Sequence, residues 1–155
     1  MRVPELRIRP CPCPCPCPCP KERNGAVGRA DMGFMQLDHE RLDVYELALE
    51  FLVLANGIIE GLPRGRSHLA DQFTRASLSI VLNLAEGAGK HSKLDKRRYY
   101  LTARGSATES AALLDVCVRL KLLDEAGHKT AKGMLVRVVS MLIKLAQSCE
   151  DASNA

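Results

Sequence analysis

Short breaks divide residues 41–148 into four long segments with the spacing of amphipathic helices. The first segment covers about 41–60 and stops at Gly61, with Pro63 just beyond, a typical helix stop. The second covers about 67–86, with Ser67 as a candidate cap, and ends in Gly87-Ala88-Gly89. Both segments are long enough to form stable helices in a packed domain.

The second half of the chain repeats this pattern. Ser92, followed three residues later by Asp95, predicts a capped helix that runs to about Leu123. A fourth helix is expected from Asp124 or Thr130 to about residue 148. Because short connections make successive helices antiparallel neighbours, residues 38–149 predict an all-α, up-down-up-down four-helix bundle.

Composition supports helices over sheets. Aromatic residues are 4% of the 155, with no Trp, whereas a β-sandwich is rich in β-branched and aromatic residues. No stretch approaches the roughly 18 consecutive apolar residues that a membrane span needs. With no apolar signal segment after Arg2 either, we expect a cytoplasmic protein.

Residues 1–34 differ from the rest of the chain. Cys and Pro alternate strictly from Pro10 to Pro20, which predicts a disordered low-complexity tail outside the fold. One alternative is soft-metal binding by the cysteines, although their spacing differs from that of ordinary zinc sites. Another is that translation starts at Met32 or Met35 and that the repeat belongs to upstream DNA.

Charge is sorted along the body of the chain. Residues 36–60 carry a net charge of −5 and residues 64–104 a net charge of +6, while 105–155 balance at six of each sign. The positive segment is a candidate surface for an acidic partner.

The first helix is apolar around more than half of its circumference. One stripe comprises Leu42, Tyr45, Leu49, Leu52 and Ile59. A soluble monomer rarely exposes a large apolar patch, so we expect a homo-oligomer. The alternative is one wide core face. The stripe assigned to the interface with another subunit is Val44, Leu47, Phe51, Leu54 and Ile58.

The second and third helices carry less common patterns. The second has a polar stripe within a sector of about 80°, which favours a hydrogen-bonded seam between helices, an ordinary exposed face being the alternative. In the third, Gly105 costs about 1 kcal/mol relative to Ala, which suggests a close helix approach there. The polar stripe is Gln72, Arg75, Ser79, Asn83 and Glu86.

No catalytic constellation stands out. The four histidines are isolated, and the sequence has no P-loop or nucleophile elbow. Glu125 and His128 have the spacing of di-iron bundles, but such a site needs a second motif and further carboxylates. We therefore expect no enzyme, no cofactor and no metal.

Several short motifs occur along the body of the chain: Leu42-x-Val44-Tyr45, Gln72-x-x-Arg75-Ala76, Ser79-Ile80-x-x-Asn83-Leu84-Ala85-Glu86-Gly87, Gly105-Ser106 and Glu109. With these motifs the body resembles the bacterial "four helix bundle protein" family, which includes 23S rRNA intervening-sequence proteins and the accessory variability protein (Avd) of diversity-generating retroelements. The family usually has Phe-Pro after the first helix, where this chain has Leu62-Pro63. The resemblance implies homopentamers that associate with nucleic acid, and, in retroelements, with a reverse transcriptase and RNA.

These observations predict a non-enzymatic oligomer that binds RNA or DNA through a basic patch at the turn between the second and third helices. Tyr99 and Tyr100 beside the patch could stack on bases, or either could be core. The alternative function is a protein-interaction adapter without nucleic acid. The candidate contacts are Lys90, His91, Lys93, Lys96, Arg97, Arg98 and Arg104, with Arg64 and Arg66 expected at the opposite end of the bundle.

Overall fold

The structure is a computed structural model that describes residues 36–151. These residues form four α-helices and no strand, which confirms the predicted all-α class. A short 3₁₀ helix, η1 (Asp38–Arg41), precedes the helices α1 (Asp43–Glu60), α2 (Ser67–Ala88), α3 (Lys93–Arg119) and α4 (Glu125–Asp151). The chain divides into the units 1–34 and 35–155, and the predictions for the Cys-Pro tail lie outside the described residues.

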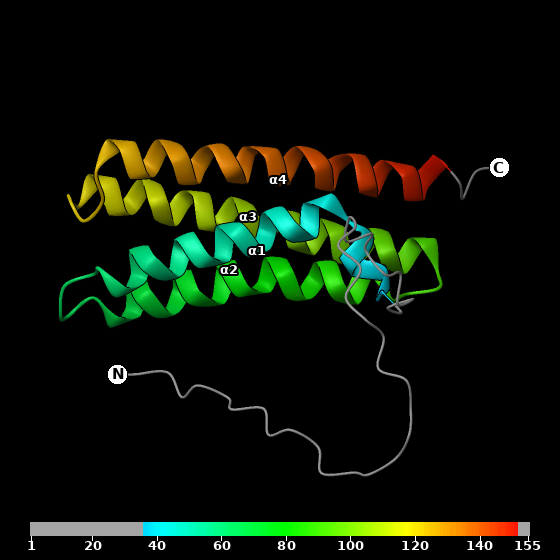
Figure 1. Ribbon diagram of the computed structural model, residues 1–155, viewed down its shortest axis with the longest axis horizontal. Coiled ribbons are helices and arrows are strands. Elements are labelled where there is room, and N and C mark those ends of the chain that lie inside the picture. The colour runs from blue at the N-terminus through cyan, green and yellow to red at the C-terminus, as the bar shows by residue number, and fades with distance from the viewer. Residues whose placement is uncertain (1–35, 152–155) are drawn as a thin grey trace, which may run out of the picture. The chain divides into compact units, whose positions relative to one another are not determined.

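Consecutive helices run antiparallel and lie side by side (Figure 1). Helix α1 packs on α2 and α4, and α3 packs on α2 and α4. The α2–α3 turn therefore lies at the same end of the bundle as the start of α1 and the end of α4, and the α1–α2 and α3–α4 turns lie at the other end (Figure 1).

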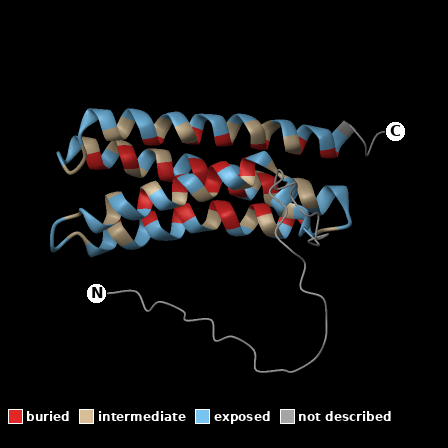
Figure 2. Ribbon diagram, viewed as in Figure 1, coloured by how far each residue is buried: buried red, intermediate tan, exposed pale blue. Residues whose placement is uncertain are grey.

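The core runs along the whole bundle, with buried positions on the inward side of each helix (Figure 2). Phe51 of α1 and Phe73 of α2 are fully buried, with ring centroids 6.4 Å apart. Cys117 is also buried, which raises the pKa of its thiol. Among the described residues, no helix has both the length and the apolar character that crossing a membrane requires.

Helix ends agree with the sequence where a side chain or glycine marks them. The Asp95 amide donates to Ser92 Oγ over 3.4 Å, so the predicted cap of α3 is confirmed. Ser67, in contrast, is the first residue of α2, and no side chain caps that helix.

Helix α3 ends at Arg119 rather than near Leu123 because the backbone turns into the left-handed region at Lys121, whose φ is +56°. The Leu122 amide then donates to the Cys117 carbonyl over 2.8 Å, and the Lys121 amide to the Val118 carbonyl over 2.9 Å. This pair of bonds is the Schellman helix ending, which usually has glycine at the left-handed position. Without that glycine the sequence gives no sign of the end.

The predicted subunit interface needs a correction. Val44, Leu47 and Phe51 are at most 6% exposed and belong to the core of the single chain, so their assignment to an interface is wrong. Leu54 and Ile58 are half-buried and line an open apolar hollow. The two stripes of α1 are similarly apolar, and only the position of α1 against α2 and α4 decides which one turns inward. The outward side of α1 carries half-buried Leu42, Tyr45, Leu49 and Leu52 and, at 74% exposure, Val53.

The close helix approach predicted at Gly105 occurs instead at Gly87. A Cβ built on Gly105 would meet no atom within 4 Å, so that prediction is wrong. A Cβ on Gly87 of α2 would lie 2.9 Å from Tyr100 Cε1 and 3.0 Å from Tyr99 Cβ of α3. Gly87 therefore makes room for the buried Tyr100 ring at the α2–α3 end of the bundle.

The two glycines should respond to alanine in opposite directions. Gly105→Ala should stabilise the chain by about 1 kcal/mol, because alanine favours the helix and the added methyl group has open space. Gly87→Ala should lower the melting temperature, because displacing two tyrosines costs about 1–3 kcal/mol and outweighs the same helix gain. Thermal unfolding followed by circular dichroism measures both; a Gly87→Ala variant as stable as Gly105→Ala would contradict the close approach.

Candidate nucleic-acid interface

The polar stripe of α2 forms a seam with α3 over part of its length. Ser79 Oγ lies 2.8 Å from Ser106 Oγ of α3, and Asn83 Nδ2 donates to Ser79 Oγ over 3.0 Å and to the Ser79 carbonyl over 2.8 Å. The expected hydrogen bonding between helices is therefore present at Ser79, whereas Asn83 bonds within α2 and supports Ser79. Gln72 and Arg75, in contrast, are exposed and make no hydrogen bond or ion pair within residues 36–151.

The last residue of the stripe, Glu86, anchors the first cation of the predicted patch. Lys90 Nζ lies 3.1 Å from Glu86 Oε1 and 4.9 Å from the centre of the Tyr99 ring. Hydrogen bonds from the Tyr99 hydroxyl and the Lys90 ammonium lower the pKa of Glu86, and the carboxylate raises the pKa of Lys90. Lys90 is therefore held over Tyr99 by attraction to the ring and the carboxylate.

The second tyrosine of the pair is not available for stacking. Tyr100 is 4% exposed, and its burial raises the pKa of its hydroxyl. Of the two alternatives considered for the tyrosines, Tyr100 is core and Tyr99 lies half-buried beneath Lys90.

Arg97 also has a structural contact. Its guanidinium forms an ion pair with Glu150, which joins the start of α3 to the end of α4. The buried Arg97 Nε has no hydrogen-bond partner within the described part of the chain. This arginine therefore connects two helices in addition to adding positive charge.

The remaining cations of the predicted patch do not share one face. At about 100° per residue, Lys96 and Arg98 project from α3 in directions about 160° apart. Neither makes an ion pair with the described residues, and Arg98 is exposed whereas Lys96 is half-buried. His91 and Lys93 are exposed at the same turn, and Arg104 is exposed about two turns further along α3.

Arg64 and Arg66 lie in the α1–α2 turn, at the opposite end of the bundle, as expected (Figure 1). The nine predicted contacts therefore belong to separate surfaces rather than to one patch. The largest group surrounds the α2–α3 turn and the first two turns of α3.

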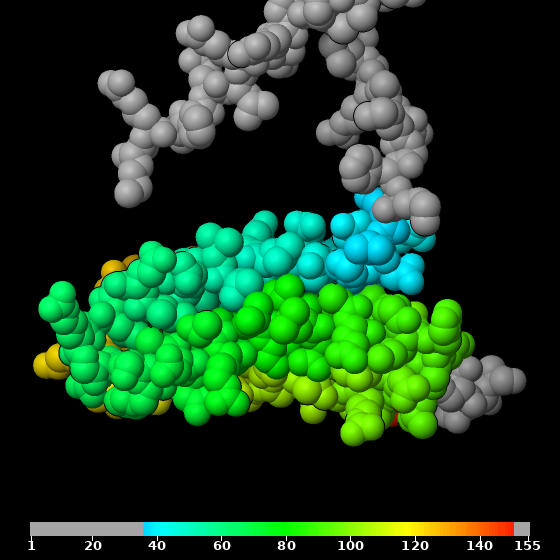
Figure 3. All heavy atoms as spheres, turned by 90° about the horizontal axis from the view of Figure 1, so that it is seen from below, coloured from blue at the N-terminus to red at the C-terminus, as the bar shows by residue number. Residues whose placement is uncertain are grey.

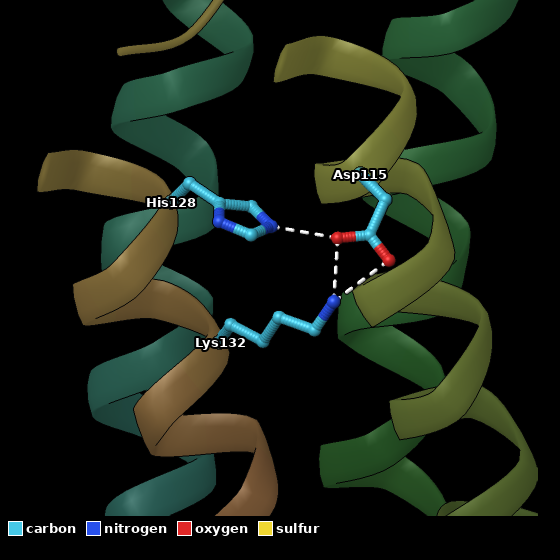
Figure 4. Close-up of polar contacts among 3 residues, drawn as sticks. All are labelled: Asp115, His128 and Lys132. Carbon is cyan, nitrogen blue, oxygen red and sulfur yellow. Dashed lines mark hydrogen bonds and ion pairs between the residues drawn. The ribbon is translucent and has the colours of Figure 1, made fainter. Parts of the chain in front are cut away.

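Sequence analysis missed a cluster that bridges α3 and α4 near their shared turn. Lys132 Nζ lies 2.6 and 2.7 Å from the two carboxylate oxygens of Asp115, and His128 Nε2 lies 2.6 Å from Oδ1 (Figure 4). Because an ionised carboxylate only accepts, His128 donates from Nε2. His128 and Lys132 stand four residues apart on one face of α4, a signal that the sequence contains, but their partner is visible only once the two helices are in register.

The cluster borders a hollow of about 760 Å³ that Arg119, Lys129 and Glu125 also line. Glu125 and His128, considered above as a fragment of a metal site, both lie here. No group of three or more metal-binding side chains occurs among the described residues.

The Asp115 cluster predicts a pH-dependent stability difference. Hydrogen bonds from Lys132 and then His128 lower the pKa of Asp115 in the folded chain. The ionised carboxylate is therefore stabilising above its ordinary pKa of about 3.9, and this contribution is lost as the pH falls through the lower, folded value. Asp115→Asn should lower the free energy of unfolding at neutral pH by at most about 1 kcal/mol, because solvent screens the pair.

Urea unfolding from neutral pH to below about pH 4 tests this expectation, with Glu109→Gln on the exposed side of α3 as the charge-matched control. The gap between wild type and Asp115→Asn should shrink only at the acid end of the range. A gap that stays constant down to the lowest pH would show that the carboxylate charge is not the cause.

Comparison with known proteins agrees with the fold. A crystal structure of a protein of unknown function from the S23 ribosomal protein family of Bacteroides thetaiotaomicron VPI-5482 superposes with a TM-score of 0.63 at 20% sequence identity; the match covers 67% of this chain and 95% of that one. No curated protein matches the chain. Residues 40–144 match the family described as 23S rRNA-intervening sequence protein. Since that match spans most of the chain and all of α1 to α3, the chain belongs to the 23S rRNA-intervening sequence protein family.

Proposed function

We propose that the chain is a non-enzymatic, cytoplasmic scaffold that self-associates and binds nucleic acid, RNA or DNA, at the α2–α3 end of the bundle. The observation that carries the proposal is the uneven pairing of charge at that end. Glu86 and Glu150 engage Lys90 and Arg97, whereas Lys96 and Arg98 have no carboxylate partner in the described part of the chain. Uncompensated cations of this kind attract phosphate groups, and they give binding its salt dependence.

Self-association is supported by the outward side of α1. Val53 is 74% exposed, and Leu49 and Leu52 beside it are only half-buried. In Figure 3, α1 and α2 lie side by side along one face of the bundle, and Leu82 of α2 adds a further side chain at 57% exposure. The family resemblance points to a pentamer, in which each copy would present the same cationic end and multiply the local charge density. In a retroelement setting, a reverse transcriptase would be a further partner.

A double variant tests nucleic-acid binding at the α2–α3 end. Lys96→Gln with Arg98→Gln should weaken binding of RNA or DNA and reduce the slope of log affinity against log salt by about 0.9 for each lost phosphate contact. Arg97 is left intact because it holds α3 to α4. Fluorescence anisotropy across a salt series measures both quantities.

The matched control removes two exposed cations of α4, with Arg137→Gln and Lys144→Gln. Its affinity should stay close to that of wild type. An unchanged affinity and slope in the Lys96/Arg98 variant would refute the proposed surface. Absence of any salt-sensitive binding by the wild type, together with recovery of a defined protein partner, would favour the adapter alternative.

Self-association is tested on α1. Val53→Lys should shift the protein toward the monomer in light scattering while its helical circular dichroism is retained, because a charge cannot be buried without a partner. Val136→Lys on α4 is the control, since it changes a valine that is also exposed, at 59%, on another helix. A wild-type protein that scatters as a single subunit at micromolar concentration would contradict the scaffold.

A further inference from the structure

The face between α3 and α4 carries contacts near both of its ends. Arg97 pairs with Glu150 near one end, and Asp115 pairs with Lys132 and His128 near the other. Residues 97 and 115 are five complete helical turns apart, so they lie on the same side of α3. Both contacts therefore belong to one continuous face.

Three hollows lie on or beside this face. At the α2–α3 end, a hollow is lined by residues of α3 alone, among them Leu94, Asp95, Arg97 and Arg98. A second hollow, in the middle, is lined by small and aliphatic side chains, including Thr108, Ala111 and Val136, and reaches Lys132. Lys132 also borders the third hollow, the one beside Asp115, so the second and third hollows are neighbours.

Positive charge on this face is neutralised by carboxylates at the two ion-pair contacts. Elsewhere on the face, three cations have no carboxylate partner among the described residues. The carboxylates of Glu150 and Asp115 already engage cations. Arg104, Arg119 and Lys129 are exposed and make no ion pair with the described residues, although Glu125 shares the third hollow with two of them. Arg119 and Lys129 line the hollow beside Asp115, and Arg104 lies on α3 between Arg97 and the middle hollow, so three available cations follow one another along this face.

We propose that this α3–α4 groove is a track for a nucleic-acid backbone, which leads from the α2–α3 end of the bundle to the hollow beside Asp115. The inference rests on the proposed function and extends it to a second, distant set of phosphate contacts. From Arg97 to Arg119 the track measures about 33 Å at 1.5 Å per helical residue. A B-form duplex needs about 10 base pairs to cover that distance.

The test removes the three available cations and varies the length of the DNA. Arg104→Gln, Arg119→Gln and Lys129→Gln together should reduce the salt slope for a duplex of about 20 base pairs by up to about 2.7. For a hairpin duplex of about 6 base pairs, which is too short to cover the track, the reduction should be smaller. RNA duplexes of the same lengths form a second arm.

The control variant removes three exposed cations elsewhere, with Arg75→Gln on α2 and Arg137→Gln and Lys144→Gln on α4. Lys144 borders a hollow with Arg41 and Leu42, on the side of α4 that faces α1. The control should keep the affinity that wild type gains from the longer duplex. An equal loss in the control and the track variant would overturn the groove in favour of a simple effect of total charge.

The remaining outcomes separate this inference from the proposed function. If the track variant binds like wild type while Lys96→Gln with Arg98→Gln weakens binding, the track is wrong and binding at the α2–α3 end stands. If the track variant keeps the full gain from the longer duplex, the track is also wrong. If wild type binds neither DNA nor RNA, both proposals fail together.

Discussion

The absence of a side chain at Gly87 determines how the α2–α3 end of the bundle is built. Tyr100 packs into the core only because Gly87 has no side chain at the point where the tyrosine ring contacts α2. Once Tyr100 is buried, the orientation of the first turns of α3 is fixed, and so are the directions of Tyr99, Lys96 and Arg97. Lys90 then meets both a carboxylate and an aromatic face. The electrostatics of this end therefore depend on one close packing contact.

The cations of residues 36–151 are of two kinds, those that pair with a carboxylate and those that do not. Lys90, Arg97 and Lys132 each have an acidic partner and contribute to helix contacts. Their charge is largely cancelled at short range, whereas exposed cations without such a partner remain available to a phosphate. Charge counted along the sequence does not separate these kinds, because Glu150 lies 53 positions from Arg97 in the chain. The structure thus narrows the candidate surface to fewer side chains than the sequence suggested.

Sequence patterns predicted the four helices and their order because glycine, proline and a serine cap mark most of the ends. They failed at the end of α3, where Lys121 adopts a backbone conformation that is usually left to glycine. They also could not rank the two apolar stripes of α1, since burial depends on where α2 and α4 lie. The pairing of Asp115 with His128 and Lys132 could not be predicted for a related reason. These side chains come together only because of how α3 and α4 are aligned along their lengths.

Lys121 has a mechanical consequence for the α3–α4 groove. The Schellman bonds around it reverse the chain within a few residues, so α4 starts at Glu125, almost directly after α3 ends at Arg119. A connection of five residues, three of them held by backbone hydrogen bonds, is too short to let one helix slide along the other by a turn. The distances between the cations of the groove are therefore fixed, and a bound nucleic acid has to adjust its own shape to the protein.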